Sequence, residues 1–321
     1  MKRIKENGTK FFNMFSTFGL LIMVKWLFFR LLNCLTKYIK IDIYNKYIYN
    51  FLDDFVKHAS IYVETPNVCN ENTGKIPVWC FWGQGIDNAP EIIRTCVESH
   101  KNILKKNELF EYHLLDYSDV KKMKIVEDRL FELVESGTLS FTHFCDVLRC
   151  KLLYKYGGLY IDAAFYMTDF ICEDINNYNF YSIKKNLDGI NYKSRTSSKG
   201  RWVVGAMYSK PGYLLFDFLN QFFEMYLKKF DTFIDYFMLD ALIDYAYNNY
   251  EIVRKDIDEI PINNTMIYEL EHISEKAYNK TEYDRITAHT HIHNITHKRE
   301  HKKYDTNNQL TFYGFIIENT L

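Results

Sequence analysis

The 321-residue sequence lacks several patterns that would point to common classes of protein. Its formal net charge is −1, so no strong positive field draws it to nucleic acid, and it contains neither a zinc finger nor an RNA-binding signature. The seven cysteines form no CxxC pair, which indicates free thiols in a reducing compartment, and we expect a cytoplasmic protein. Neither GxxxxGK[ST] nor GxSxG occurs, so the sequence has no phosphate-binding loop and no serine-hydrolase elbow.

The first 65 residues also contain no apolar run long enough to cross a membrane. The run over residues 11–35 is broken by Lys25 and Arg30, whereas a spanning helix needs about 20 nearly uncharged residues. A small-residue cleavage site is missing, which argues against a secretory signal. Basic and aromatic side chains here are typical of a helix in an anionic membrane interface, and packing on the rest of the protein or on a partner is the alternative. We predict an N-terminal helical segment over residues 1–65, with residues 1–60 in peripheral contact with the inner face of the cell membrane.

After a polar linker over residues 65–77, strand and helix patterns alternate. Asn88 is expected to cap a helix that has Pro90 in its first turn, and Gly157 and Gly158 are expected to end another. We expect strands over residues 76–82, 112–115, 159–167 and 310–317, and helices after residues 88–90 and over 141–156, 213–230 and 233–247. This alternation predicts an α/β fold with an open sheet, in one domain over residues 75–321 behind the N-terminal helical extension.

The most informative segment is HFCDVLRCKLLYKYGGLYIDAA, over residues 143–164. Asp146 and Arg149 are three residues apart, so they share one face of a helix. The chain then turns at a glycine pair into a strand that carries Asp162 near its end, and ligands of open α/β sheets bind beyond the carboxyl ends of strands. Carboxylates accept hydrogen bonds from sugar hydroxyls, and a guanidinium can neutralise a diphosphate. The alternative is an Asp–Arg pair at the surface with an unrelated acid in a turn.

These motifs resemble those of the capsular polysaccharide synthesis proteins and, more distantly, the DXD sugar-binding glycosyltransferases of family 32 and the clostridial glucosylating toxins. Such proteins share a helix with a Ser-Asp-x-x-Arg-like start, a Tyr-Gly-Gly turn and a strand ending in Asp-x-Asp. The corresponding elements here are residues 145–149, 156–158 and 162–164, and further similarity covers residues 76–93, 199–212, 233–240 and the histidine-rich stretch near the C-terminus. The resemblance implies a GT-A-type nucleotide-sugar-binding fold with an open mixed, mainly parallel sheet flanked by helices.

The resemblance also implies roles for individual residues. Asp146 and Arg149 would contact the donor sugar, and Asp162 would lie near the ribose and the metal. The expected catalytic residues are Asp146, Arg149 and Asp240; the donor-binding residues are Trp79, Trp82, Gly83, Asp146, Arg149, Tyr156, Gly158 and Asp162; and the acceptor side holds Trp202, Gly205 and Asp235. Asp235 and Asp240 are expected on one aromatic-rich helix, with a solvated helix face as the alternative. Residues 202–205 are expected on a strand leading into the cleft, and burial in the core is the alternative for Trp79 and Trp82.

The resemblance further implies a divalent cation, Mn²⁺ or Mg²⁺, that bridges the donor diphosphate. Ala164 stands where DXD enzymes place their second acid, so one carboxylate remains for a hard cation, and weak or absent metal dependence is the alternative. Asp162 and His293 are the expected metal ligands, His293 through its position in the relatives. His289, His291 and His293 alternate and would face one way on a strand, while an exposed strand with incidental histidines is the alternative.

We therefore predict a hexosyltransferase that uses a nucleoside-diphosphate sugar, most simply a UDP-sugar. Its acceptor would be a glycan or a lipid-linked glycan during synthesis of a capsule or another cell-surface polysaccharide. One alternative is a catalytically inactive glycosyltransferase-like subunit that scaffolds a polysaccharide-assembly complex, which the alanine at position 164 favours. A membrane-tethered, lectin-like module that binds free glycan is another. Nucleic acid is not an expected partner.

Overall fold

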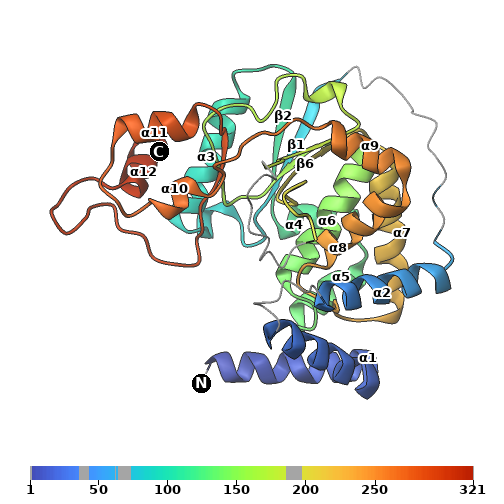
Figure 1. Ribbon diagram of the computed structural model, residues 1–321. Coiled ribbons are helices and arrows are strands. Elements are labelled where there is room, and N and C mark those ends of the chain that lie inside the picture. The colour runs from blue at the N-terminus through green and yellow to red at the C-terminus, as the bar shows by residue number, and fades with distance from the viewer. Residues whose placement is uncertain (1, 36–42, 62, 64–73, 186–196, 321) are drawn as a thin grey trace.

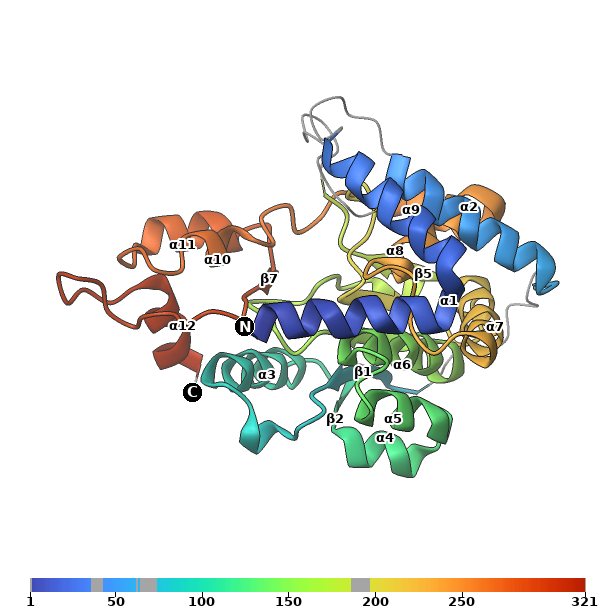
Figure 2. The same ribbon diagram turned by 90° about the horizontal axis from the view of Figure 1, so that it is seen from below.

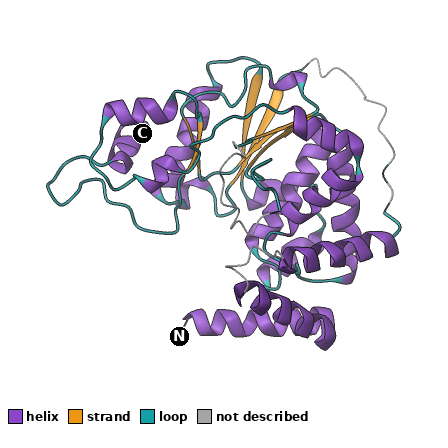
Figure 3. Cartoon of the chain, in the orientation of Figure 1, coloured by secondary structure: helices purple, strands orange, loops and turns teal. Residues whose placement is uncertain are grey.

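The computed structural model describes residues 2–35, 43–61, 63, 74–185 and 197–320 of the chain. A sheet stands at the centre, with helices on either side of it (Figure 3). In Figure 1, α3 lies to the left of the sheet, and α6, α7, α8 and α9 lie to its right. Most of the predicted linker lies outside the described residues.

The central sheet has five strands in the order β2-β1-β3-β6-β5. Four strands point the same way, because β1 is parallel to both β2 and β3, while β6 alone is reversed between β3 and β5. The strands are β1 (Ile76–Phe81), β2 (Phe110–Leu115), β3 (Gly158–Ile161), β5 (Phe180–Ser182) and β6 (Ala206–Ser209). A separate antiparallel pair is formed by β4 (Phe165–Met167) and β7 (Ile292–Asn294). This confirms the α/β class with an open mixed, mainly parallel sheet, consistent with a GT-A-like fold.

The helices cover both faces of the sheet, so its central strands are buried on both sides. β1 and β3 are apolar at nearly every position, which is typical of doubly covered parallel strands. The helices are α1 (Lys2–Leu35), α2 (Ile43–His58), α3 (Glu91–Leu104), α4 (Tyr117–Met123), α5 (Asp128–Glu135), α6 (Phe141–Tyr156), α7 (Leu214–Lys229), α8 (Met238–Asn249), α9 (Glu251–Glu259), α10 (Glu269–His272), α11 (Lys280–Thr287) and α12 (Phe312–Thr320), with short 3₁₀ turns η2 (Ile86–Asn88) and η3 (Ile175–Asn177).

The helix that carries the Asp–Arg pair, α6, has the bounds predicted from its sequence. The Ser140 hydroxyl accepts a hydrogen bond from the His143 N–H at 3.2 Å, which caps the first turn. Gly157 ends the helix with a φ of 64°, a conformation that glycine adopts without strain. Local sequence signals therefore determine both ends of this helix.

The N-terminal segment consists of two helices that pack together. Residue Gly19 interrupts α1 with a φ of 74°, and the half that follows lies beside α2 (Figure 2). Phe55 of α2 packs against Phe222 and Tyr226 of α7, with ring centroids 5.1 and 5.4 Å apart. Helix α2 thus packs against α7 through buried aromatic rings. The division of the chain into domains over residues 1–65 and 75–321 stays a prediction. Within the described residues, no helix is both long and apolar enough to cross a membrane.

The predicted strand over residues 159–167 is divided in two by a turn. β3 ends at Ile161, where the Asp162 N–H donates to the Gly205 carbonyl at 2.8 Å, and the Phe165 N–H donates to the Asp162 carbonyl at 2.9 Å. These bonds reverse the chain before β4. Residues 202–205 belong to the facing turn rather than to a strand, because β6 starts at Ala206. The predicted strands over residues 159–167 and 202–205 were therefore wrong at this turn, because hydrogen bonds between segments distant in sequence define it.

Three further predictions, one of a strand and two of helix boundaries, also need correction. Residues 312–320 form α12 rather than a strand, with Phe312, Tyr313, Ile316 and Ile317 buried at helical spacing. The predicted helix over residues 233–247 begins at Met238, so Asp235 lies in the turn before α8. Asn88 ends η2, and Pro90 occupies the N-cap of α3 without a side-chain cap.

We predict that Gly158→Ala destabilises the fold far more than Gly212→Ala. Both glycines have positive φ values, 90° and 72°, so each substitution adds about 1–2 kcal/mol of backbone strain. A Cβ at Gly158 would also lie 2.0 Å from the Pro77 carbonyl oxygen, whereas one at Gly212 meets nothing within 4 Å. Thermal unfolding should give a drop of a few degrees for Gly212→Ala and a much larger drop, or no folded protein, for Gly158→Ala. Equal drops would contradict the close approach of β1 and β3.

Candidate functional site

The candidate site lies at the carboxyl ends of two neighbouring parallel strands. Trp82 and Gly83 directly follow β1, and Asp162 directly follows β3. In Figure 1, β1 begins at the upper end of the sheet, so its carboxyl end lies toward the lower end. This is the edge at which open α/β sheets bind ligands.

A buried guanidinium forms the centre of the site. Arg149 Nη2 lies 3.2 Å from Asp162 Oδ1 and 3.7 Å from Asp146 Oδ1. Nη1 donates to the Val204 carbonyl at 2.6 Å, and Nε donates to the Cys145 carbonyl at 3.3 Å. The Arg149 side chain is 4% exposed, whereas that of Asp162 is 36% exposed. Asp162 is therefore the member of this cluster that a ligand can reach.

The position of the Asp162 carboxylate depends on a glycine in the facing turn. The Asp162 N–H donates to the Gly205 carbonyl, which brings the two backbones together. A Cβ at Gly205 would lie 2.4 Å from Asp162 Oδ2, so any larger residue would displace the carboxylate. The predicted residue Gly205 thus shapes the site by leaving room for the Asp162 carboxylate.

Two buried carboxyl groups flank the arginine. Asp240 lies in the first turn of α8, and its Oδ1 accepts a hydrogen bond from Trp202 Nε1 at 3.1 Å. Burial raises the pKa of Asp240 to about 7. The hydrogen bond from Trp202 and the positive charge of Arg149 act in the opposite direction and lower the pKa. Burial likewise raises the pKa of Asp146 to about 7; Arg149 opposes this, and the negative charges of Asp240 and Asp162 add to it. This pair therefore titrates near neutral pH and can hold a proton there.

Asp235 connects the site to the N-terminal helices. Its Oδ2 accepts a hydrogen bond from the Tyr44 hydroxyl at 2.5 Å, and that hydroxyl accepts one from Trp26 Nε1 at 3.0 Å. The charge of Asp235 contributes to the raised pKa of Asp240. A chain of contacts thus runs from α1 through α2 to the predicted acceptor side, and no motif indicated that Tyr44 is part of it.

The structure places three predicted donor-binding residues away from Asp162. Gly158 is at the amino end of β3, about 13 Å along the strand from Asp162 at roughly 3.3 Å per residue. Trp79 is buried, stacks on His113 and donates from Nε1 to the Gly157 carbonyl at 2.9 Å. Tyr156 packs against Trp79, with ring centroids 5.5 Å apart. These contacts account for Trp79 as a core residue, which was the alternative given for it.

Trp82, in contrast, lies at the same edge as Asp162. Its half-buried ring meets His297 edge-on, with centroids 5.3 Å apart. Its Nε1 is covered but has no hydrogen-bond partner among the described residues. Gly83 packs so closely on the start of α6 that a Cβ would lie 2.1 Å from the Phe141 ring. Trp82 therefore offers a half-buried aromatic surface at this edge, while its N–H is enclosed by the protein.

Among the described residues, the predicted metal ligands Asp162 and His293 belong to no cluster of three or more side chains that could hold a metal ion. His293 of β7 is fully buried, its Nε2 lies 3.2 Å from the Thr168 hydroxyl, and burial together with His291 lowers its pKa to about 3. Only His293 of the alternating histidines is in a strand, and His289 lies in a bend before it. No group of three or more His, Cys, Asp or Glu side chains in the described part of the chain could hold a metal ion. The role of Asp162 and His293 as metal ligands and the metal dependence stay predictions.

Two contributors to the site were missed by the sequence analysis. The Arg149 guanidinium lies over the Tyr160 ring, 4.7 Å from its centroid, and the Val204 carbonyl accepts its shortest hydrogen bond. The spacing along the strand could have indicated Tyr160, because residues two apart on a strand point to the same face and Tyr160 is two residues before Asp162. The role of the Val204 carbonyl could not be predicted, because every residue has a backbone carbonyl whatever its side chain.

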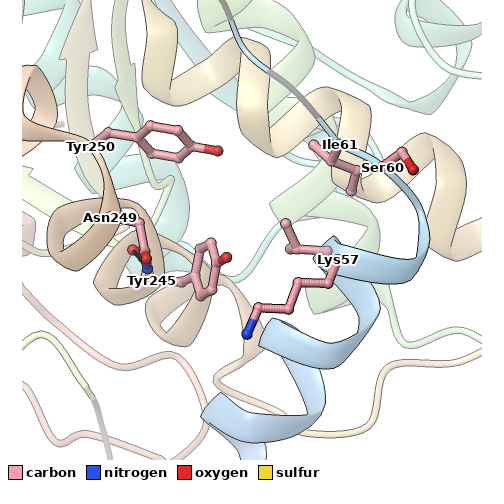
Figure 4. Close-up of a pocket in the computed structure, with 7 residues that line it drawn as sticks. Lys57, Ser60, Ile61, Tyr245, Asn249 and Tyr250 are labelled. Atoms are coloured by element: carbon pink, nitrogen blue, oxygen red, sulfur yellow. Dashed lines mark hydrogen bonds between the residues drawn. The ribbon is translucent and has the colours of Figure 1, made fainter.

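A pocket lies elsewhere on the protein, between the end of α2 and the end of α8 (Figure 4). Its lining includes Lys57, Tyr245, Asn249 and Tyr250, and it contains none of the predicted site residues. Asp53 accepts hydrogen bonds from Lys57 at 2.6 Å and from Tyr245 at 3.4 Å. The bond from Tyr245 joins α8 to α2, so we interpret this region as a joint between helices rather than as the candidate site.

We predict that Asp240→Asn stabilises the protein at alkaline pH. The unfolded Asp240 ionises near pH 4, but the folded one ionises at about pH 7, so the wild type loses stability as the pH rises between these values. Asn keeps the oxygen that accepts from Trp202 and carries no charge. We expect its unfolding midpoint at pH 8 to exceed that of the wild type by at least about 3 °C, with the difference shrinking toward pH 4. A difference that does not change with pH would contradict the raised pKa.

Comparison with known proteins adds one finding to this geometry. The sequence model of the family described as capsular polysaccharide synthesis protein matches residues 32–316, which is most of the chain. The match includes every residue predicted for the site, from Trp79 to His293. No curated protein matches the sequence. The chain therefore belongs to the capsular polysaccharide synthesis protein family.

Proposed function

We propose that this protein is a cytoplasmic glycosyltransferase that moves a hexosyl unit from a nucleoside-diphosphate sugar to a glycan or lipid-linked acceptor. The observation that carries the proposal is the open Asp162 carboxylate, held by the buried Arg149 at the carboxyl end of β3. Membership of the capsular polysaccharide synthesis family supports a biosynthetic role. A UDP-sugar is the donor that we would test first.

In this proposal Asp162 binds the donor and Arg149 supplies positive charge behind it. A carboxylate accepts hydrogen bonds from sugar or ribose hydroxyls, and the ion pair with Arg149 fixes where it does so. The guanidinium is almost fully removed from water, so its charge acts more strongly on a departing diphosphate than an exposed one would. Trp82 offers its half-buried ring to the nucleotide at the same edge.

The acceptor hydroxyl has to lose a proton, and the buried carboxyls are the groups placed to take it. With pKa values of about 7, Asp146 and Asp240 exchange protons at the pH of the cytoplasm. Asp240 is the better candidate, because Trp202 orients its carboxyl group from the predicted acceptor side. Asp146 lies behind Arg149 and acts by positioning it.

A catalytically inactive subunit of a polysaccharide-assembly complex is the second candidate. Ala164 replaces the second acid of the DXD pattern, and no group of three or more ligating side chains among the described residues could hold a cation. A hard cation would then take its other oxygen ligands from the diphosphate and from water. This arrangement is weak for a metal-dependent transferase but adequate for a protein that only binds the nucleotide.

The test is a panel of nucleotide-sugars incubated with the purified full chain, scored for release of nucleoside diphosphate. We expect release from one donor, and a fall of at least 100-fold in Asp162→Asn, because the isosteric amide carries no charge. Asp284→Asn on the exposed surface of α11 is the matched control and should keep full activity. Parallel reactions with Mn²⁺, Mg²⁺ and EDTA measure the metal dependence.

Each other outcome has a distinct meaning. Binding of a nucleotide-sugar without release from any donor would favour the inactive subunit. Release that survives Asp162→Asn, in a variant whose unfolding midpoint shows that it is folded, would place the reaction centre elsewhere. Binding of free glycan without nucleotide would support the lectin-like module.

A further inference from the structure

An unusual concentration of exposed apolar side chains lies on α1. Of the fourteen large hydrophobic residues that are exposed in the described chain, seven lie between Phe15 and Leu31. Their exposures run from 37% for Leu27 to 68% for Leu21. Exposed apolar side chains are usually scattered singly, and a contiguous group marks a surface that contacts something apolar.

Six of these side chains form one stripe along the second half of the helix. At about 100° per residue, they fall within an arc of roughly 120°. The stripe consists of Leu20, Leu21, Val24, Leu27, Phe28 and Leu31. Lys25 and Arg30 are exposed and lie just beyond its two borders. Apolar side chains flanked by cations on both sides are the pattern of a helix that lies in the plane of a lipid interface.

The opposite face of the same helix is already used for packing. Met23 and Trp26 are buried, and Phe29 stacks on Tyr47 of α2 with ring centroids 4.8 Å apart. In Figure 1, α1 lies below α2 at the lower margin of the protein. The stripe is therefore a second apolar face, and no part of the described chain covers it.

The charge of this region identifies the kind of apolar partner. Residues 1–40 contain eight Lys or Arg and a single acid, Glu6, which gives a net charge of +7. Because the whole chain carries −1, residues 41–321 carry −8. Two copies of a segment with this charge repel each other, so the stripe is poorly suited to self-association. An anionic lipid surface combines an apolar interior with negative charge and complements both properties.

We propose that α1 lies in the headgroup region of an anionic lipid surface, with the stripe from Leu20 to Leu31 inserted. Helix α1 is not both long and apolar enough to cross a membrane, so in this proposal it lies in the plane of the lipid surface. The hydrogen bonds from Trp26 to Tyr44 and from Tyr44 to Asp235 then link the lipid-bound helix to the acceptor side. The lipid contact does not depend on the proposed function, but it places an acceptor carried by lipid within reach of the site.

The test is flotation of the full-length protein with vesicles of phosphatidylcholine alone or with 30% phosphatidylglycerol, at two salt concentrations. We expect the wild type to float with the anionic vesicles and to bind at least tenfold less at high salt or without phosphatidylglycerol. The double variant Leu21→Glu with Phe28→Glu should lose at least tenfold in binding. Both side chains are more than half exposed, so the fold should survive, which circular dichroism checks.

Two further variants complete the design. Ile262→Glu replaces an apolar side chain of similar exposure outside α1 and should float like the wild type. Lys25→Glu should weaken binding to anionic vesicles while leaving the stripe intact. The proposal is overturned if the wild type does not float or if the double variant floats equally well. It is also overturned if light scattering shows a dimer that the double variant abolishes in the absence of lipid.

Discussion

The ionic and hydrogen bonds of Arg149 hold the candidate site together. A guanidinium this deeply buried is tolerated only where its charge and its N–H groups are paired, since an unpaired buried charge destabilises a protein by several kcal/mol. Its partners come from three parts of the fold: Cys145 and Asp146 from α6, Asp162 from the end of β3, and the Val204 carbonyl from the turn before β6. The need to satisfy one side chain therefore fixes three segments relative to one another.

The carboxyl groups around this cation are in excess of what it can neutralise. Asp146, Asp162 and Asp240 influence one another or Arg149 electrostatically, and burial raises the pKa of each. Such a cluster destabilises the folded state near neutral pH, where a hydrophobic core at the same place would not. Functional sites often contain such unfavourable interactions, and the rest of the fold offsets them. The cluster is therefore explained if the same carboxyl groups bind a hydroxylated ligand and move a proton.

Local signals made part of this arrangement predictable. Ser140 and Gly157 bound α6, and the three-residue spacing of Asp146 and Arg149 on it placed them on one face. The turn at Asp162 was not predictable, because it depends on the Gly205 carbonyl 43 residues later. The placement of Gly158 also failed to follow from motif order, since Gly158 and Asp162 are close in sequence but lie at opposite ends of β3. For α12, an apolar run suited both a strand and a helix, and packing selected the helix.

The most direct test of the account is a crystal structure of the protein with an unreactive analogue of the donor that the nucleotide-sugar panel identifies, such as a 2-fluoro sugar nucleotide. The account predicts the sugar or ribose within hydrogen-bonding distance of Asp162, the diphosphate beyond the carboxyl ends of β1 and β3, and the base near Trp82. A nucleotide bound at the amino end of β3, against Trp79, Tyr156 and Gly158, or in the pocket between α2 and α8, would contradict it.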